Sequence, residues 1–228
     1  MRSIKPGRER ISGPRVEPRH RHHEAYLLIA VSGAFEQASY GGRHIVAAGD
    51  NLVQPTLDAH ANALRTDTVE ILRLPWRHDG SLGGRYRSSD LDLLVRTAER
   101  DVHEACALVE REVAAQLPLQ PQRDDWPDQL ATELASGRAA CLSEWADRHG
   151  LVPESISRGF RRAFGVSAST FRLELKSRRA WLAIAGSRKP MATIAAECGF
   201  ADQAHMSRSV FALTGVAPSC WRDTCPTR

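Results

Sequence analysis

An internal repeat constrains this chain of 228 residues more than any other feature. The octapeptide GVSASTFR at residues 165–172 returns as GVAPSCWR at residues 215–222. The similarity extends upstream: residues 142–151 overlay residues 191–200, and Ser157-Arg158 overlays Ser207-Arg208. Each copy reads as helix, glycine-containing turn, helix, which is the layout of a helix-turn-helix. A single copy would be compatible with any packed helix pair, but two in tandem favour DNA binding.

The helical period divides the second helix of each copy into two faces. The buried positions are Ile156, Phe160 and Phe164 in the first copy, and Met206, Val210 and Thr214 in the second. The outward positions are Glu154, Ser157, Arg158 and Arg161 in the first copy, and Ala204, Ser207, Arg208 and Phe211 in the second. Arginine therefore recurs at one outward position, and arginine is well suited to reading guanine in the major groove.

A helix over about residues 170–185 joins the two copies and predicts their spacing. At 1.5 Å per residue it is roughly 24 Å long. With the width of two modules added, it would place the outward faces in successive major-groove segments, about 34 Å apart.

Charge is unevenly distributed along the chain. Residues 138–228 hold 14 Lys and Arg against 7 Asp and Glu, whereas residues 1–137 hold 17 against 20. A basic surplus confined to one domain suggests a polyanionic partner.

The front of the chain has a different pattern. Residues 1–18 combine prolines, glycines and mixed charges, which predicts a flexible arm. Short β-branched and aromatic runs follow, with a hairpin signal at Gly41-Gly42, and predict a small antiparallel barrel over residues 19–87. Residues 88–125 predict a helix of roughly seven turns and a linker, whose apolar stripe could pack on the strands or pair with a second copy.

Composition excludes several other classes of protein. The five cysteines are scattered and form no Cys-x-x-Cys pair, which argues against a disulfide framework and a zinc knuckle. No apolar run approaches the roughly 20 residues of a membrane span, and the first residues lack a signal-peptide core. We expect a cytoplasmic protein without a membrane partner.

The motif CGFADQAHMSRSVF, followed by TGVAPSCWR and preceded by its weaker copy, resembles the C-terminal domain of AraC/XylS-type bacterial transcription regulators. The resemblance covers roughly residues 126–222, within an expected DNA-binding domain of residues 126–228. The resemblance implies an activator or repressor that binds promoter DNA, with RNA polymerase and possible homodimer contacts, and no enzymatic activity. The residues that it assigns to DNA binding are Glu154, Ser157, Arg158, Gln203, Ala204, Ser207 and Arg208. To these we add Arg161 and Arg162 of the first copy as expected DNA-binding residues. Two positions depart from the pattern: Val152 replaces a usual serine cap, and Phe211 a usual polar residue.

The segments HRHHEAYLLIAVSG and GDNLVQPTLDAH resemble the two cupin motifs. The resemblance implies that His20, His22 and His60 occupy metal-ligand positions, although Tyr26 stands where cupins carry a glutamate. A barrel of this kind implies a small-molecule effector pocket, which we expect to include Tyr26 and His60. No cofactor is required by this interpretation, and a divalent metal is an open possibility.

We therefore expect an α+β, multi-domain chain: a cupin-like barrel, a linker helix, and an all-α domain with two helix-turn-helix motifs. The predicted function is effector-controlled, sequence-specific DNA binding. The alternatives are a metal-binding cupin enzyme with an accessory helical domain, and a regulator that works without a ligand.

Overall fold

The computed structural model describes residues 5–13, 16–77, 83–121, 124–137 and 141–222. The chain forms two compact units, one of residues 1–133 with 162–165, and one of residues 134–161 with 166–228. The first is built mainly of strands and the second of helices, which confirms the predicted α+β class. None of the helices in the described part of the chain has the length and apolar character needed to span a bilayer.

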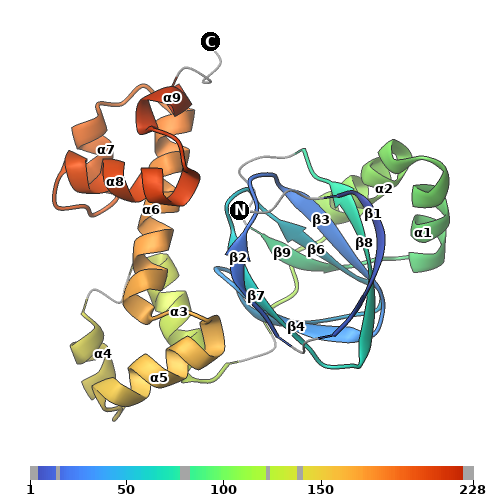
Figure 1. The fold of residues 1–228 in the computed structure, drawn as a ribbon, viewed down its shortest axis with the longest axis horizontal. Helices are drawn as coiled ribbons and strands as arrows, with labels where there is room; N and C mark the ends of the chain where they lie inside the picture. The colour runs from blue at the N-terminus through green and yellow to red at the C-terminus, as the bar shows by residue number, and fades with distance from the viewer. Residues whose placement is uncertain (1–4, 14–15, 78–82, 122–123, 138–140, 223–228) are drawn as a thin grey trace. The chain divides into compact units, whose positions relative to one another are not determined.

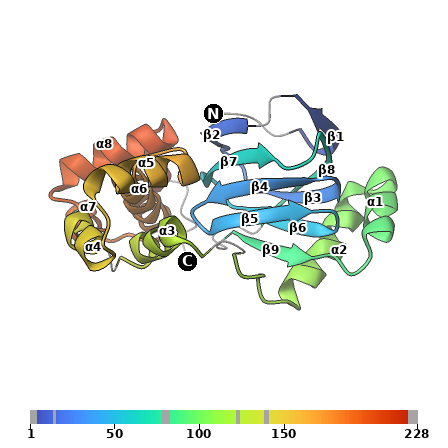
Figure 2. The ribbon, with the colours of Figure 1, turned by 90° about the horizontal axis from the view of Figure 1, so that it is seen from below.

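The strands of the first unit form two antiparallel sheets that curve around a common interior (Figures 1 and 2). The five-stranded sheet has the order β1-β8-β3-β6-β9, and the four-stranded sheet has the order β2-β7-β4-β5. The strands are β1 (Gly7–Ser12), β2 (Val16–Arg21), β3 (Tyr26–Ser32), β4 (Ala34–Ser39), β5 (Gly42–Ala47), β6 (Asp50–Gln54), β7 (Ala59–Leu64), β8 (Thr68–Pro75) and β9 (Gly84–Arg87). The predicted Gly41-Gly42 hairpin joins β4 to β5, where Ser39 pairs with Gly42.

Strand β3 is apolar along most of its length because both of its faces are covered. Tyr26, Leu28 and Ala30 belong to the core inside the barrel. Leu27 and Ile29 belong to a second core on the outer side of the sheet, together with residues of two helices. The alternation of side chains along a strand thus lets one segment contribute to two cores.

The helices α1 (Leu91–Arg100) and α2 (Val102–Ala114) cover that outer side. Their stripe, through Leu94, Ala105 and Val109, packs on the five-stranded sheet, which is one of the two alternatives that its pattern left open. The predicted single helix of seven turns is wrong, because the chain breaks at Asp101. The extended Asp101 caps α2, with its side chain accepting hydrogen bonds from the backbone N–H groups of His103 and Glu104.

The predicted flexible arm over residues 1–18 also needs correction, because Gly7–Ser12 form β1 and β2 begins at Val16. Strand β1 pairs with β8 over six residues. Charge pairs reinforce this pairing, since Arg8 contacts Glu70 at 2.7 Å and Arg73 forms an ion pair with Glu9. The proline and glycine content of residues 1–18 is typical of a flexible segment, so strand β1 was not predicted. The partner of β1 is β8, which lies far from it in the sequence.

The helical unit is arranged around α6 (Ala168–Gly186), with one helix pair near each end (Figure 1). The other helices are α3 (Trp126–Ser136), α4 (Leu142–Arg148), α5 (Pro153–Phe164), α7 (Met191–Glu197), α8 (Gln203–Thr214) and α9 (Pro218–Arg222). The start of α3 and the end of α5 are assigned to the first unit. Aromatic edge-to-face contacts join α6 to α5 and to α9. The Phe160 and Phe171 ring centroids lie 5.3 Å apart, and those of Trp181 and Trp221 lie 5.6 Å apart.

The starts of α5 and α8 differ in their caps. Asp202 caps α8, because its side chain accepts the backbone N–H of His205 at 2.6 Å. Val152 occupies the equivalent position before α5, where its carbonyl accepts the N–H of Ser155 but its side chain offers no acceptor. Val152 is also 57% exposed, so its side chain contributes little packing.

The exchange Val152→Ser should therefore raise the free energy of unfolding by about 1 kcal/mol, because a serine hydroxyl can accept a backbone N–H in the first turn of α5. Asp202→Ala should lower the free energy of unfolding by a similar amount. Urea unfolding of the full chain, followed by circular dichroism, measures both. Val152→Ala provides no acceptor and is the matched control, so a Val152→Ser protein no more stable than Val152→Ala would contradict the capping argument.

Candidate functional site

The two helix pairs have the same turn geometry. In the first, the N–H of Leu151 donates to the carbonyl of Ala146 at 3.0 Å, and in the second the N–H of Phe200 donates to the carbonyl of Ala195 at 2.9 Å. The glycines within these turns have left-handed φ values of 63° at Gly150 and 74° at Gly199. This is the hydrogen-bond pattern of a glycine-terminated helix, and it redirects the chain into the second helix at the same point of each copy.

Each second helix buries the face that its sequence predicts. Ile156, Phe160 and Phe164 of α5 are at most 5% exposed, and Met206, Val210 and Thr214 of α8 are at most 1% exposed. Both helices are therefore anchored in the same rotational phase, with the same positions facing outward.

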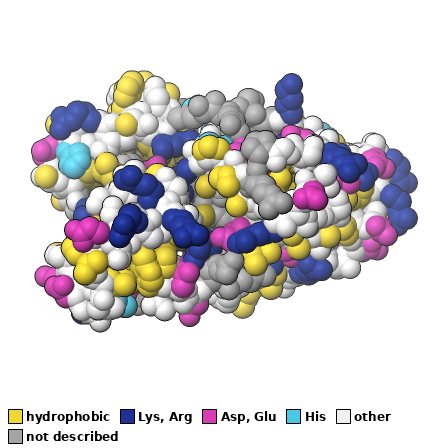
Figure 3. Space-filling model, turned by 60° about the horizontal axis from the view of Figure 1, so that its bottom comes forward, with side chains coloured by type: hydrophobic (Ala, Val, Ile, Leu, Met, Phe, Trp, Pro, Cys, Tyr) yellow, Lys and Arg dark blue, Asp and Glu magenta, His cyan; other side chains and the backbone are white. Residues whose placement is uncertain are grey.

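The residues assigned to DNA binding lie on the outward faces of α5 and α8. The exposed ones are Glu154, Ser157, Arg158, Arg161 and Arg162 on α5, and Gln203, Ala204 and Arg208 on α8, while Ser207 is half-buried. Within the described part of the chain, neither the Arg158 nor the Arg208 side chain has a hydrogen-bond or ion-pair partner. Figure 3 shows Lys and Arg side chains on the visible face of the helical unit, at the left of the view.

Phe211 extends the outward face of α8 beyond Arg208. It is 54% exposed, and it follows Ala204 and Arg208 at helical spacing. An exposed aromatic ring beside an arginine gives this helix an apolar contact surface in addition to a charge. The ring does not disturb the helix, because Met206 and Val210 remain fully buried.

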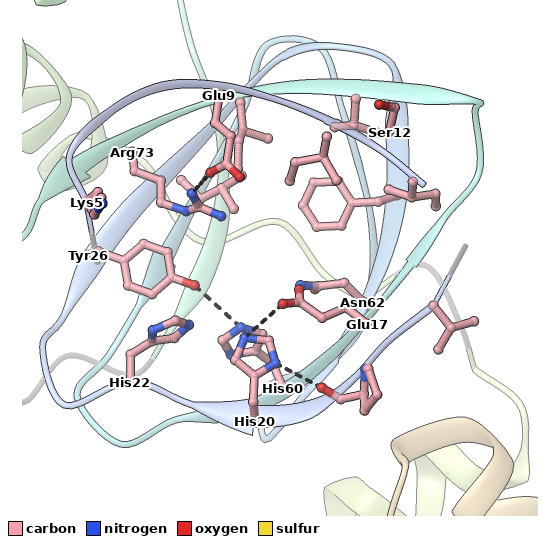
Figure 4. A pocket seen from close by; sticks show the side chains of 18 residues that line it. Lys5, Glu9, Ser12, Glu17, His20, His22, Tyr26, His60, Asn62 and Arg73 are labelled. Atoms are coloured by element: carbon pink, nitrogen blue, oxygen red, sulfur yellow. Dashed lines mark hydrogen bonds and ion pairs between the residues drawn. The ribbon is translucent and has the colours of Figure 1, made fainter. Parts of the chain in front are cut away.

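The barrel contains a cavity of about 550 Å³ (Figure 4). One wall is apolar and belongs to the interior core, with Leu28, Phe35, Val69 and Ile71 among its residues. The other end is polar and carries His20, His22, Tyr26, His60, Glu17 and Asn62. Arg73 lies beside Glu9, away from the three histidines. The volume is in the range of small-molecule pockets.

Both residues expected in an effector pocket, Tyr26 and His60, line this cavity. Sequence reasoning missed Glu17, Asn62 and Arg73. A signal was present for Asn62, because it lies two residues after His60 on β7 and so shares its face of the strand. Arg73 carries the same kind of signal, because it lies two residues after Ile71 on β8 and so shares its face of the strand. Glu17 carries none, since a bulge in β2 lies between it and His20.

The three histidines expected at metal-ligand positions come together at the polar end. One ring nitrogen of each of His20, His22 and His60 lies within 4.8 Å of the others. His20 and His60 are cross-strand partners in β2 and β7. His23, the fourth histidine of the segment, is exposed and lies outside this group.

Burial controls the charge at this end of the cavity. Loss of hydration, followed by the neighbouring His20 and His22, holds the pKa of His60 well below its usual value, so this imidazole is neutral at neutral pH. Burial also disfavours the charged form of Tyr26, and it therefore raises the pKa of the Tyr26 phenol. The Tyr26 hydroxyl and His60 Nε2 lie 3.4 Å apart, whereas His60 Nδ1 is buried without a hydrogen-bond partner in the described structure.

Comparison with known proteins finds a family relationship in the C-terminal part of the chain and two curated relatives. A family model described as a helix-turn-helix domain matches residues 145–224. The arabinose operon regulatory proteins of Salmonella typhimurium and Escherichia coli are 35% identical over 75 residues, which is 33% of this chain. The matched segment spans 27% and 26% of those relatives, about a quarter of their length.

Two solved structures show a general likeness. ToxT from Vibrio cholerae, bound to an unsaturated fatty acid, has a TM-score of 0.41 and 11% identity, covering 96% of this chain and 94% of that one. The C-terminal domain of AraT from Geobacillus stearothermophilus has a TM-score of 0.43 and 17% identity, covering 47% of this chain and 91% of that one.

The predicted relationship is thus confirmed where the repeat lies. Helix pairs α4–α5 and α7–α8 fall within the matched segment, apart from the first residues of α4. Residues 145–224 of this chain match a helix-turn-helix domain family, and the chain is similar over 75 residues to the arabinose operon regulatory proteins.

Proposed function

We propose that the protein is a transcription regulator that binds DNA sequence-specifically through α5 and α8, under the control of a small molecule bound in the barrel. The observation that carries the proposal is the pair of exposed arginines, Arg158 and Arg208, at equivalent positions of two helices held in the same phase. In this role the chain acts by binding and not by catalysis.

Helix α6 supports simultaneous binding of both helix pairs. It has 19 residues, which corresponds to about 28 Å of rigid helix. Successive major-groove segments on one face of DNA are about 34 Å apart. The length of α6 and the width of the helix pairs near its ends suit two neighbouring segments, so α5 and α8 would read one continuous site.

The outward residues divide by chemistry into two roles. Arg158 and Arg208 suit base reading, because a guanidinium can donate two hydrogen bonds to guanine. Arg161 and Arg162 suit phosphate contacts, which strengthen binding to any duplex. The surplus of 14 Lys and Arg over 7 Asp and Glu in residues 138–228 favours the same polyanionic partner.

The cavity is the proposed effector site. Its apolar wall and polar end suit a small amphipathic molecule. Such a molecule can change promoter affinity only by its difference in affinity for the DNA-binding and non-binding arrangements of the chain. RNA polymerase and a second copy of the chain are further partners that we propose for promoter activity.

We expect Arg208→Ala to cost about 1–3 kcal/mol of binding free energy at the preferred site and to relax selectivity at one base pair, because a base contact is lost. Arg158→Ala should do the same at a position about one helical turn away. The preferred site is first selected from a random duplex pool. Dissociation constants are then measured for that site and for a scrambled duplex at one stated salt concentration.

Arg188→Ala is the control for lost charge, because Arg188 is exposed but lies outside α5 and α8. It should weaken binding to the preferred and scrambled duplexes by the same small factor. If Arg208→Ala also weakened both duplexes equally, Arg208 would contact phosphate and the base-reading assignment would be wrong.

A further inference from the structure

We propose that α8 selects thymine on both sides of the guanine that Arg208 binds, because Ala204 and Phe211 contact the thymine methyl groups in the major groove. This base preference rests on the proposed function, since it requires α8 to lie in the major groove. It gives α8 a recognition chemistry that α5 does not share.

Ala204, Arg208 and Phe211 form one stripe along the outward face of α8. They are four and three residues apart, which is the spacing of neighbours on one side of a helix. All three are exposed, and the Phe211 ring is 54% exposed. Met206 and Val210 on the opposite face are fully buried, so the helix cannot rotate to cover the ring without exposing its own core.

The first copy carries charged residues at two of the equivalent positions. At a separation of 50 residues, the three positions of the α8 stripe correspond to Glu154, Arg158 and Arg161 of α5. The central arginine is common to both helices, whereas its neighbours are charged on α5 and apolar on α8. The buried faces of both helices are closely packed, so this difference concerns what the helices contact outside the protein.

Thymine is the base that suits an apolar side chain. It presents a 5-methyl group in the major groove, and contacts of alanine or phenylalanine with that group are a known means of reading it. Cytosine presents an amino group at the same edge, and an apolar side chain would leave that donor without an acceptor. Burial of one methyl group contributes about fourfold in affinity.

The spacing along α8 fits neighbouring base pairs. At 1.5 Å per residue, Ala204 lies about 6 Å and Phe211 about 4.5 Å from Arg208 along the helix axis. Base pairs are stacked roughly 3.4 Å apart. Each thymine should therefore lie one or two base pairs from the guanine, on opposite sides of it.

The position of Arg208 favours DNA over a protein as the partner of Phe211. The arginine lies between the two apolar residues, and its side chain has no hydrogen-bond or ion-pair partner in the described structure. Any surface that covers Phe211 also removes this guanidinium from water, which is costly without acceptors. A guanine flanked by thymines supplies both the acceptors and the apolar groups.

Deoxyuridine tests the methyl contacts, because it differs from thymidine only in lacking the 5-methyl group. The preferred site is selected with the full chain, and the guanine of Arg208 is the base whose preference Arg208→Ala relaxes. Deoxyuridine at either flanking thymine should weaken binding of the native chain about fourfold. If cytosine replaces one of these thymines, 5-methylcytosine should bind better than unmodified cytosine by a similar factor.

Phe211→Ala should abolish the effect of deoxyuridine at one of the two thymines and leave the effect at the other unchanged. Phe211→Leu keeps an apolar side chain and should keep both effects. Val216→Ala is the matched control, because Val216 is apolar, 39% exposed and lies outside α8. It should also keep both effects, and circular dichroism should show all three variants folded, since neither side chain is buried.

Ala204→Glu gives α8 the residue that α5 carries at the equivalent position. A carboxylate accepts a hydrogen bond from the amino group of cytosine, so repeated selection should yield cytosine in place of the thymine that Ala204 contacts. The thymine beside Phe211 should remain selected. Selection of thymine at both positions by Ala204→Glu would exclude Ala204 from base reading.

Failure of the base preference and failure of the regulator give different results. If no duplex is enriched from the random pool, the proposed function is wrong and the thymine preference with it. If a site is enriched but the native chain binds thymine and deoxyuridine equally, only the thymine preference is overturned. Unchanged affinity of Phe211→Ala for every duplex would also overturn it, because the exposed ring would then serve a partner other than DNA.

Discussion

The left-handed turns at Gly150 and Gly199 are the constraint on which the helical unit depends. A side chain at such a φ would strain the backbone, so glycine allows the chain to leave one helix and enter the next within a few residues. The turn sets the angle of each second helix, and the buried residues at positions such as Phe160 and Val210 set its rotation. Arg158 and Arg208 face outward in both copies as a result. The backbone turn and the buried residues, and not the charge of the arginines, thus determine where the proposed DNA contacts lie.

The barrel depends on strand β3, whose side chains belong to two hydrophobic cores. Helices α1 and α2 cover the outer side of this strand. Those helices complete the outer core, while the interior of the barrel holds a cavity of about 550 Å³ lined in part by Leu28, Phe35 and Ile71. The polar end of the cavity lies where β2 and β7 meet. A ligand there would contact apolar residues of the core and the histidines together.

The two candidate sites use charge in opposite ways. On α5 and α8, the arginines are exposed and keep their hydration until a partner replaces it, so their contribution should depend strongly on salt. In the barrel, burial lowers the pKa of His60 and keeps it neutral, so its ring can accept a hydrogen bond as well as donate one. Burial, more than residue type, determines the chemistry available at each site.

The sequence by itself determined the duplicated helix pairs, their buried and outward faces, the Gly41-Gly42 hairpin and the α+β class. These features are local or periodic, so they can be predicted from spacing along the chain. Only the tertiary structure decided that residues 7–12 are a strand, that Asp101 divides a long helix, and that Glu17 lies beside His20. The physical reason is that strand pairing, bulges and cross-strand neighbours join segments far apart in the chain, and no local period records them. His20 and His60, 40 positions apart, become partners only when β2 pairs with β7.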